Sequence, residues 1–233
     1  MSAELVGMAA AAWLTSAPAR AETGDLDSPR ADAAHHKVAF ENEYVRVVRW
    51  VIPAHEKSAL HAHPSLVNVL LTDSNLRVTT PDGKTAEVHG KARTVAWRGP
   101  TTHVVENVGD APAEGVLVEP KTPGNPAWAP PPNDSLKLDP TRHKLELENG
   151  EVRVERFVIG KGETVPMHDH PTNVVVFLSD AHARSSEPGG KVTETRKKPG
   201  DAVYRTALSH SVENLGETFE GFVIALKGAP SKP

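Results

Sequence analysis

The sequence predicts an all-β protein made of two tandem domains, each folded as a sandwich or barrel. A long segment recurs once at a constant offset, and both copies consist of short stretches rich in β-branched and aromatic residues, separated by turn signals. Neither copy shows a helical periodicity of useful length. Many short strands at regular spacing are typical of β-sandwiches and β-barrels.

The internal repeat organises the whole chain. Residues 37–109, beginning KVAFENEYVRVVRWVIP, align with residues 144–216, beginning KLELENGEVRVERFVIG, without an insertion. The offset is constant, as the pair His61 and His168 shows (168 − 61 = 107). Because each repeat of this kind is one structural unit, the sequence predicts two domains of similar fold.

Each copy contains matching strand and turn signals. The segments 44–52 and 152–159 are rich in residues that favour strands, as are 66–71 and 173–178. PDGK at 81–84 and PGGK at 188–191 are turn signals at equivalent positions. In a closed barrel of such strands, alternate side chains point into the interior, where they can form a site.

Proline-rich sequence separates the two copies. The stretch EPKTPGNPAWAPPPNDSLKLDP, residues 119–140, contains prolines that remove backbone donors and hold the chain extended. We therefore expect a first domain at 35–119, a Pro-rich linker at 120–142 and a second domain at 143–228.

The N-terminal segment has features of a secretory signal. A short apolar stretch from Leu5 to Leu14 is followed by the A-x-A cleavage pattern at 19–21. Residues 1–21 are therefore predicted to be a signal peptide, and the protein to be periplasmic or secreted. Ahead of the apolar stretch stands Glu4 and no Lys or Arg, so a start further upstream, or a cytoplasmic location if the segment is not a signal, are the alternatives.

The composition argues against several classes of function. The chain has 38% hydrophobic and 24% charged residues, as expected of a globular protein with a buried core. Lys and Arg number 26 against 30 Asp and Glu, and no dense basic run occurs, so we expect no nucleic-acid partner. The apolar stretch is short for a membrane span, and we expect no membrane partner. Without cysteine, a metal must be held by nitrogen and oxygen.

Six histidines recur in register and form candidate metal sites. Residues two positions apart on a strand lie on the same face, so the first two histidines of each copy project in the same direction. A third histidine follows forty residues later (103 − 63 = 40; 210 − 170 = 40) and can complete each set from a neighbouring strand. Imidazole is a common ligand for zinc, iron, nickel and copper. The predicted metal ligands are His61, His63 and His103 in one copy and His168, His170 and His210 in the other.

Other repeated polar residues are weaker candidates. Asn107 and Asn214 share a face with the third histidine of each copy and are candidates for orienting a ligand or a substrate. The repeated arginines Arg77 with Arg184, and Arg98 with Arg205, have guanidinium groups that match a substrate carboxylate, although most repeated arginines should be exterior charges. We interpret the remaining histidines as surface or hydrogen-bonded core residues: His35, His36, His55, His89, His143 and His182.

HAHP at 61–64 and HDHP at 168–171, each followed about forty residues later by H-x-V-E-N, resemble the motifs of the cupin superfamily. GD at 200–201, ahead of His210, resembles the second cupin motif, where the first copy has RT at 93–94. The resemblance covers nearly all of both repeats and implies two tandem cupin-type double-stranded β-helix (jelly-roll) barrels, a bicupin. KVAFENEYVRV and LRVTTPDGKTAEV also resemble small cupins associated with β-alanine degradation. A homodimer is a further expectation from the resemblance.

This chain departs from the cupin pattern at one ligand. Cupins commonly supply a glutamate four or five residues after the second histidine, but here those positions hold VN at 67–68 and VV at 174–175. Glu106 and Glu213 should face away from the site, because each lies three residues from a histidine ligand. Three neutral histidines resemble the sites of some thiol and diketone dioxygenases. Such a set leaves the full dipositive charge on the ion and several coordination positions open, which favours an anionic, chelating substrate and binding of oxygen.

We therefore expect a metal-binding bicupin that acts on a small organic acid or diketone-like substrate. The first hypothesis is an iron-dependent dioxygenase, with zinc, manganese, nickel and copper as the other metals considered. The alternative is a non-catalytic protein that binds a small ligand or a metal. A metal-assisted isomerase or lyase is a further alternative, although the sequence offers no repeated inward carboxylate to act as acid or base.

Overall fold

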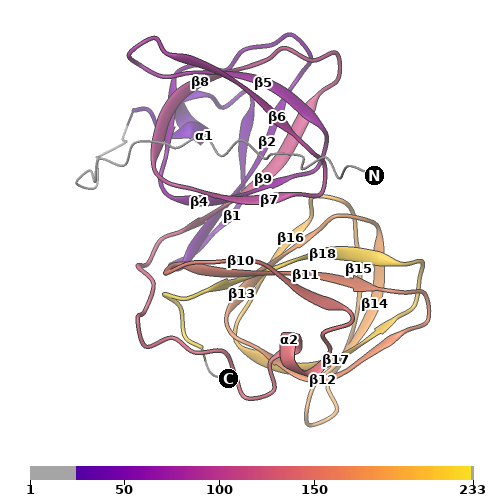
Figure 1. Cartoon of the computed structure of the whole chain (residues 1–233). Coiled ribbons are helices and arrows are strands. Elements are labelled where there is room, and N and C mark those ends of the chain that lie inside the picture. The colour runs from indigo at the N-terminus through magenta and orange to yellow at the C-terminus, as the bar shows by residue number, and fades with distance from the viewer. Residues whose placement is uncertain (1–24, 232–233) are drawn as a thin grey trace, which may run out of the picture.

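The computed structural model describes residues 25–231, which form two β-barrels joined by an irregular segment. Figure 1 shows the N-terminal barrel above the C-terminal one. The predicted all-β fold of two tandem barrels is confirmed. The predicted signal segment, residues 1–21, lies outside the described residues. No helix in the described part of the chain has the length and apolar character needed to cross a membrane.

Both barrels contain one short helix followed by nine strands. The N-terminal elements are α1 (Ser28–Ala31), β1 (His36–Glu41), β2 (Val45–Ile52), β3 (His61–His63), β4 (Leu66–Leu70), β5 (Ser74–Thr79), β6 (Thr85–Gly90), β7 (Val95–Arg98), β8 (Thr101–Asn107) and β9 (Ala113–Pro120). The C-terminal elements are α2 (Ser135–Leu138), β10 (His143–Glu148), β11 (Val152–Ile159), β12 (Thr164–His170), β13 (Asn173–Phe177), β14 (Ala181–Ser186), β15 (Val192–Lys197), β16 (Ala202–Arg205), β17 (Leu208–Asn214) and β18 (Phe219–Leu226).

The two barrels have the same strand order. Each consists of a five-stranded and a four-stranded antiparallel sheet, in the orders β1-β2-β9-β4-β7 and β3-β8-β5-β6 for the N-terminal barrel. The C-terminal sheets repeat this arrangement as β10-β11-β18-β13-β16 and β12-β17-β14-β15. Strands that are distant in sequence are therefore neighbours in each barrel, which is what brings the separated histidine motifs together.

The structural repeat begins earlier than the aligned segment. The helices α1 and α2 lie at equivalent positions (135 − 28 = 107), so α2, within the predicted linker, belongs to the second repeat. An aspartate precedes each helix and pairs with an arginine of the barrel: Asp27 with Arg46 at 2.7 Å, and Asp134 with Arg153 at 2.5 Å. These ion pairs hold the N-terminal part of each repeat against its barrel.

The central strands of the five-stranded sheets are buried on both faces. On β2, Val48, Trp50 and Ile52 face the interior of the N-terminal barrel, whereas Val45 and Val47 join a core shared with the other barrel. That shared core includes Val152, Val154, Val174, Val176, Phe222 and Ile224 from the C-terminal five-stranded sheet. Sheets with two buried faces need apolar residues at nearly every position, which explains the runs of valine in these strands.

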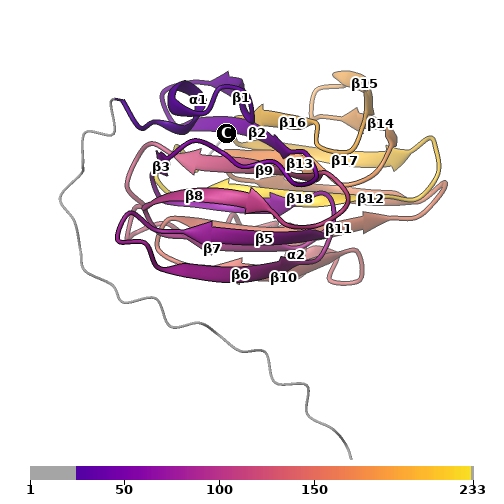
Figure 2. The same ribbon diagram turned by 90° about the horizontal axis from the view of Figure 1, so that it is seen from above.

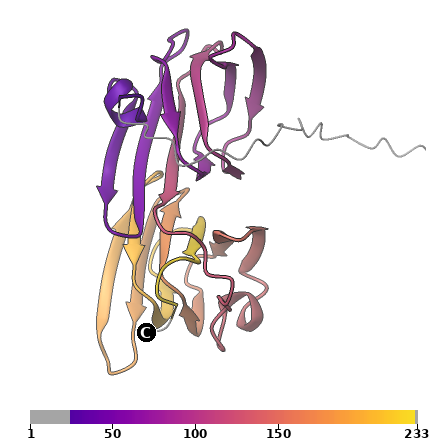
Figure 3. The same cartoon turned by 90° about the vertical axis from the view of Figure 1, so that its left-hand side faces the viewer.

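Polar contacts at the rim of this interface follow the repeat. Arg156 donates to the carbonyl oxygen of Arg93 (2.5 Å), and Arg49, its equivalent, donates to that of Pro199 (3.4 Å). Glu220 pairs with Arg156 (3.1 Å) and with Arg93. Figure 2 shows the strands of the two barrels running in similar directions, and Figure 3 shows one barrel above the other.

Candidate metal centres

Strand pairing brings the six predicted histidines together in two groups. In the N-terminal barrel, β3 pairs with β8 so that His61 lies directly opposite His103, and His63 lies on the same face two residues further along. The ring centroids of His61 lie 4.8 Å from those of both His63 and His103. The structure thus places the rings of all three predicted residues of the first copy close together.

The C-terminal barrel repeats this arrangement. There β12 pairs with β17, and His168 lies directly opposite His210. The ring centroid of His168 lies 4.6 Å from that of His170 and 4.8 Å from that of His210. The Nε2 atoms of His168 and His170 are only 2.9 Å apart, so both nitrogens face the same space.

A fourth histidine joins each group, and the sequence interpretation missed it. The ring of His36 on β1 lies 4.6 Å from that of His61, and the ring of His143 on β10 lies 5.6 Å from that of His168. The donor atoms that lie within 4.8 Å of one another belong to His36, His61 and His63 in one barrel and to His168, His170 and His210 in the other. We name these groups, each with its fourth histidine, centre 1 (His36, His61, His63, His103) and centre 2 (His143, His168, His170, His210).

The structure therefore corrects the interpretation of His36 and His143 as ordinary surface or core residues. The signal that identifies them is the repeat itself, because 143 − 36 = 107, one residue ahead of the aligned segment. By contrast, His35, His89 and His182 hydrogen-bond to Asp32, Asn75 and Glu194 and lie outside both groups.

The free nitrogens of both centres fit a divalent cation. Nδ1 of His61 contacts the carbonyl oxygen of Ala59 at 2.9 Å, and Nδ1 of His168 contacts that of Pro166 at 2.8 Å. A carbonyl only accepts, so Nδ1 carries the proton and Nε2 presents a lone pair. Nε2 of His61 and Nε2 of His210 are buried and have no hydrogen-bond partner within residues 25–231. Buried nitrogens without a partner are costly, and metal coordination would satisfy them.

Burial keeps the imidazoles of both centres neutral. It lowers the pKa of His63, His103 and His210 to about 3, with the neighbouring histidines of the same centre adding to the effect. The pKa values of His36 and His143 fall to about 4 for the same reasons. Neutral imidazole is the form that coordinates a metal, so these side chains need not lose a proton at neutral pH to do so.

Two carboxylates support the histidines of centre 1. Asp32 accepts from Nδ1 of His36 at 3.0 Å, and Glu119 lies 3.4 Å from Nδ1 of His63. Arg46 donates to Glu119 at 2.5 Å, although burial still raises the pKa of this carboxyl group. Partners of this kind fix the orientation of a histidine ligand and increase its basicity.

Centre 2 lacks these carboxylate contacts. Arg46 pairs across the sheet with Glu119, but its equivalent Arg153 pairs with Ala225. Asp139 is bound by Arg142 at 3.0 Å, and Nδ1 of His143 is buried without a partner among the residues the structure describes. The two centres thus have similar histidines in different electrostatic surroundings.

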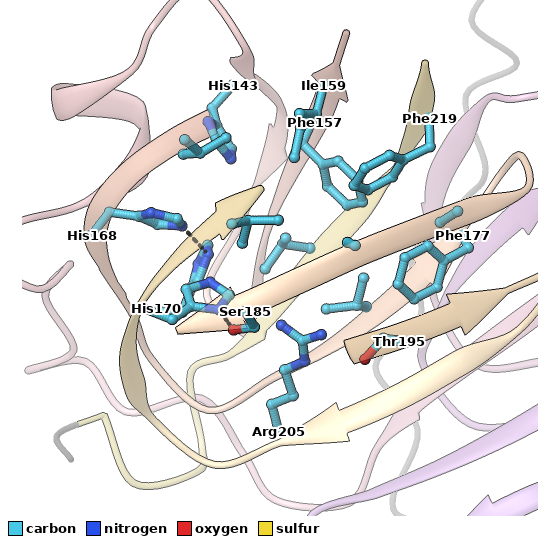
Figure 4. A pocket seen from close by; sticks show the side chains of 17 residues that line it. His143, Phe157, Ile159, His168, His170, Phe177, Ser185, Thr195, Arg205 and Phe219 are labelled. Carbon is cyan, nitrogen blue, oxygen red and sulfur yellow. Dashed lines mark hydrogen bonds between the residues drawn. The ribbon is translucent and has the colours of Figure 1, made fainter. Parts of the chain in front are cut away.

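A cavity in the C-terminal barrel opens onto centre 2. It has a volume of about 60 Å³, and its walls include all four histidines of centre 2 together with apolar side chains. Figure 4 shows Phe157, Phe177 and Phe219 grouped at one side, and the ring of Phe157 lies 5.9 Å from that of Phe219. Because about 10–15 Å³ of such space holds one water molecule, an occupant of this cavity must be small.

The equivalent positions of the N-terminal barrel carry more apolar side chains. Ala183, Ser185 and Thr195 line the C-terminal cavity, and the repeat places Leu76, Val78 and Val88 at the corresponding sites. Leu76 and Val78 pack against the interior core of the N-terminal barrel. The cavity therefore depends on side chains that differ between the two copies of the repeat.

Arg205, at the end of β16, has its guanidinium in this cavity. Figure 4 shows it pointing inward beside Ser185 and Thr195. No hydrogen bond or ion pair joins it to another residue of the described chain, and burial lowers its pKa. The equivalent Arg98 is exposed. Of the two arginines, only Arg205 lines the cavity.

The structure assigns different roles to the other predicted polar residues. Nδ2 of Asn107 donates to the carbonyl oxygens of Ile52 (2.9 Å) and Ala111 (2.8 Å), and Asn214 makes the equivalent contacts in the second copy. Both amides are thus used to fix the backbone. Arg77 and Arg184 are 41% and 43% exposed and pair with Glu106 and Glu213 on the outer face, which corrects their prediction as substrate-binding residues.

Comparisons with known proteins place the fold. Two structures of oxalate decarboxylase, one of them a single-residue variant from Bacillus subtilis, match with a TM-score of 0.57, at 13% and 14% identity over 84% of this chain and 73% of theirs. A cupin domain from Bordetella pertussis Tohama I is 27% identical over 37% of this chain and 91% of its own length, with a TM-score of 0.35. No family model and no curated protein sequence matches the chain.

Proposed function

Since this chain has the two-barrel fold of a bicupin, with a histidine group suited to a divalent metal ion in each barrel, we propose that it is a metal-dependent enzyme. Its reaction takes place in the C-terminal barrel on a small organic acid, and an iron-dependent dioxygenation is the reaction that fits the site best. The observation that carries this proposal is that the histidines of centre 2 form part of the wall of a cavity in the barrel.

The residues of centre 2 are suited to a reactive metal ion. His168, His170 and His210 would hold it through neutral nitrogens, with His143 beside them. A bound ferrous ion would supply a Lewis-acid and redox centre that can engage both a substrate oxygen and molecular oxygen. Because no carboxylate among the described residues contacts these histidines, the site keeps its positive charge and favours an anionic substrate.

The walls of the cavity serve the reaction in a different way. Phe157, Phe177 and Phe219 are buried and turn apolar surface toward the cavity. They exclude water, which strengthens every electrostatic interaction inside the site. In the dioxygenation proposed, the substrate supplies all four electrons that reduce molecular oxygen, both oxygen atoms enter the product, and no separate reductant is consumed.

Centre 1 is better suited to holding an ion firmly. Its histidines have carboxylate partners in Asp32 and Glu119, and the core around Trp50 fills the interior of that barrel. We assign it a structural role, in which a bound ion ties β1 to β3 and β8. The fold likeness to oxalate decarboxylase, a protein named for a small acid, is in keeping with an acid as substrate.

The test is oxygen uptake by protein loaded anaerobically with ferrous iron, using a panel of small acids, diketones and thiols. Wild type should consume oxygen with at least one compound. His168→Ala should lose this activity, and His61→Ala, the matched change in the other barrel, should retain it. If no compound supports oxygen uptake by the loaded protein, or if His168→Ala remains active, the proposal is wrong.

A second candidate is a non-catalytic protein that binds a small ligand. The cavity favours it as well, because its described lining includes no Asp or Glu that could act as a general base. The same lining argues against the isomerase or lyase that the sequence left open. Ligand-induced thermal stabilisation of the metal-loaded protein without turnover of any compound in the panel would favour the binding function.

A further inference from the structure

We propose that Arg205 is the carboxylate receptor of the C-terminal barrel, and that the ligand is a small monocarboxylate whose apolar part packs against Phe157, Phe177 and Phe219. The inference deepens the proposed function, because it names the substrate class of the same cavity. It also predicts which end of the ligand lies where: the carboxylate at Arg205 and the hydrocarbon at the phenyl rings, with centre 2 beside them.

The first argument is the isolation of the Arg205 charge. Its guanidinium lies in the cavity wall with no hydrogen bond or ion pair to any residue in 25–231. The acidic side chain that most influences it, Glu187, is engaged with Lys191 at 2.8 Å. Arg205 is half-buried, so its charge is less well hydrated than at an exposed arginine, and an anionic ligand that supplies the missing partner would gain from pairing with it.

The second argument is the polar group next to Arg205. Nδ1 of His210 lies 2.9 Å from Oγ of Ser185, and Nε2 of His210 faces centre 2 without a partner in the described structure. With Nε2 unprotonated, Nδ1 donates to Ser185, whose own hydroxyl proton is then free to donate to an anion. Guanidinium and hydroxyl together can bind both oxygens of a carboxylate.

The third argument limits the ligand to one carboxylate. The opposite wall is formed by phenylalanine rings and by aliphatic side chains such as Val175 and Val223. A second carboxylate placed there would be buried without a partner, at a cost of several kcal/mol. The cavity volume of about 60 Å³ further restricts the ligand to a short chain.

The N-terminal barrel lacks this arrangement and so supplies a matched control. Arg98 is exposed, and the residue opposite it across β4 and β7 is Leu66, which packs in the apolar interior. Opposite Arg205 stands Asn173 instead. Substitution of Arg98 therefore changes the same residue type at the same strand position without touching the cavity.

The test is calorimetric binding to the full chain loaded with Zn²⁺, which is redox-inactive and prevents turnover. The probes are butyrate, the uncharged butyramide and the dicarboxylate malonate. Wild type should bind butyrate at millimolar concentration or below. Butyramide should bind at least about 10-fold more weakly, the loss expected for a charge-assisted pair. Malonate should bind at least about 10-fold more weakly as well, because its second carboxylate has no partner at the apolar wall. Arg205→Met should weaken butyrate binding by at least about 10-fold, while Arg98→Met leaves it unchanged.

Other outcomes overturn the inference. These are equal butyrate binding by Arg205→Met and wild type, an equal loss in Arg98→Met, or malonate binding tighter than butyrate. Thermal stability separates a folding defect from a binding defect: without ligand Arg205→Met should be about as stable as wild type or more so, because it removes a half-buried charge that has no partner in the described chain. Butyrate binding that depends on Arg205, without oxygen uptake by the iron-loaded protein, would contradict the dioxygenase function and support Arg205 as the carboxylate receptor. Oxygen uptake together with binding that does not depend on Arg205 would support the enzyme function and contradict the role of Arg205.

Discussion

The carboxylate of Glu119 lies 3.4 Å from Nδ1 of His63, at a position where the C-terminal barrel has Ala225. This single difference gives a histidine of centre 1 a carboxylate partner that its equivalent, His170, does not have. The same nitrogen ligands are therefore expected to hold a metal with different strength in the two barrels, because such partners raise the basicity of the ligand.

Glu119→Gln should weaken metal binding at centre 1 by about 10–100-fold, the usual effect of losing a carboxylate partner of a histidine ligand. A chelator competition in a His168→Ala background, where centre 1 acts alone, measures it. Glu155→Gln, a buried glutamate change in the other barrel, is the control and should leave this affinity unchanged. An unaltered affinity in Glu119→Gln would show that the contact does not support the metal.

His36→Ala should weaken metal binding at centre 1 by at least about 10-fold, because its donor atom lies within 4.8 Å of those of His61 and His63. His89→Ala is the control, since this imidazole hydrogen-bonds to Asn75 and lies outside both centres. The same competition assay applies. Equal losses in the two variants would mean that His36 acts through the fold and is not a ligand.

The pH dependence of stability should reveal Glu155. Burial raises the pKa of this carboxyl group to about 7, against the opposing effects of Ser135 and Arg153. The folded protein holds this proton more tightly than the unfolded chain does, so the stabilisation is full below about pH 4.5 and is lost as the pH rises through about 7. Glu155→Gln, which stays neutral, should exceed wild type in stability at high pH by up to about 3 kcal/mol.

Urea unfolding of the metal-free wild type and Glu155→Gln at about pH 5 and about pH 8 checks this sign. Both proteins retain the buried histidines, so the contribution of these residues cancels in the difference in free energy of unfolding between wild type and Glu155→Gln. The variant should gain relative stability on going to the higher pH. A difference that is constant with pH, or that changes in the opposite direction, would contradict the assignment.

Asn107→Ala should reduce stability without changing metal content. The side chain is 1% exposed and its amide bonds the backbone at Ile52, Gly109 and Ala111, so its removal leaves buried groups unpaired at about 1–3 kcal/mol each. Asn107→Asp keeps the acceptor oxygen and loses the amide donor, so its stability should lie between those of wild type and Asn107→Ala or equal that of Asn107→Ala. Thermal unfolding and metal analysis together distinguish this structural role from a role at centre 1, which would also lower metal occupancy.

Much of the fold and of the centres can be predicted from the repeat. The spacing of His61 and His63, and the constant offset to His168 and His170, give two inward pairs once the strands are recognised. The same offset links His36 to His143, which lie one residue ahead of the two aligned segments. The outward direction of Arg77 also follows from the alternation of side chains along a strand, because its neighbours Leu76 and Val78 face the interior.

The direction of Arg205 could not be predicted in the same way. Arg98 and Arg205 are the same residue at the same strand position, yet one is exposed and the other lines a cavity. The difference depends on side chains that are distant in sequence, such as Leu66 or Asn173 on the neighbouring strand. The repeat specifies the barrel, whereas the cavity depends on where the two copies have diverged.

The measurement that tests the central claim most directly is the metal content of protein purified without chelators, compared among wild type, His61→Ala and His168→Ala. Two working centres predict about two ions per chain in wild type and the loss of one ion in each variant, with the other centre retained. The absence of a stoichiometric metal, even after anaerobic loading with ferrous iron or zinc, would contradict the account of both centres and the function proposed for them.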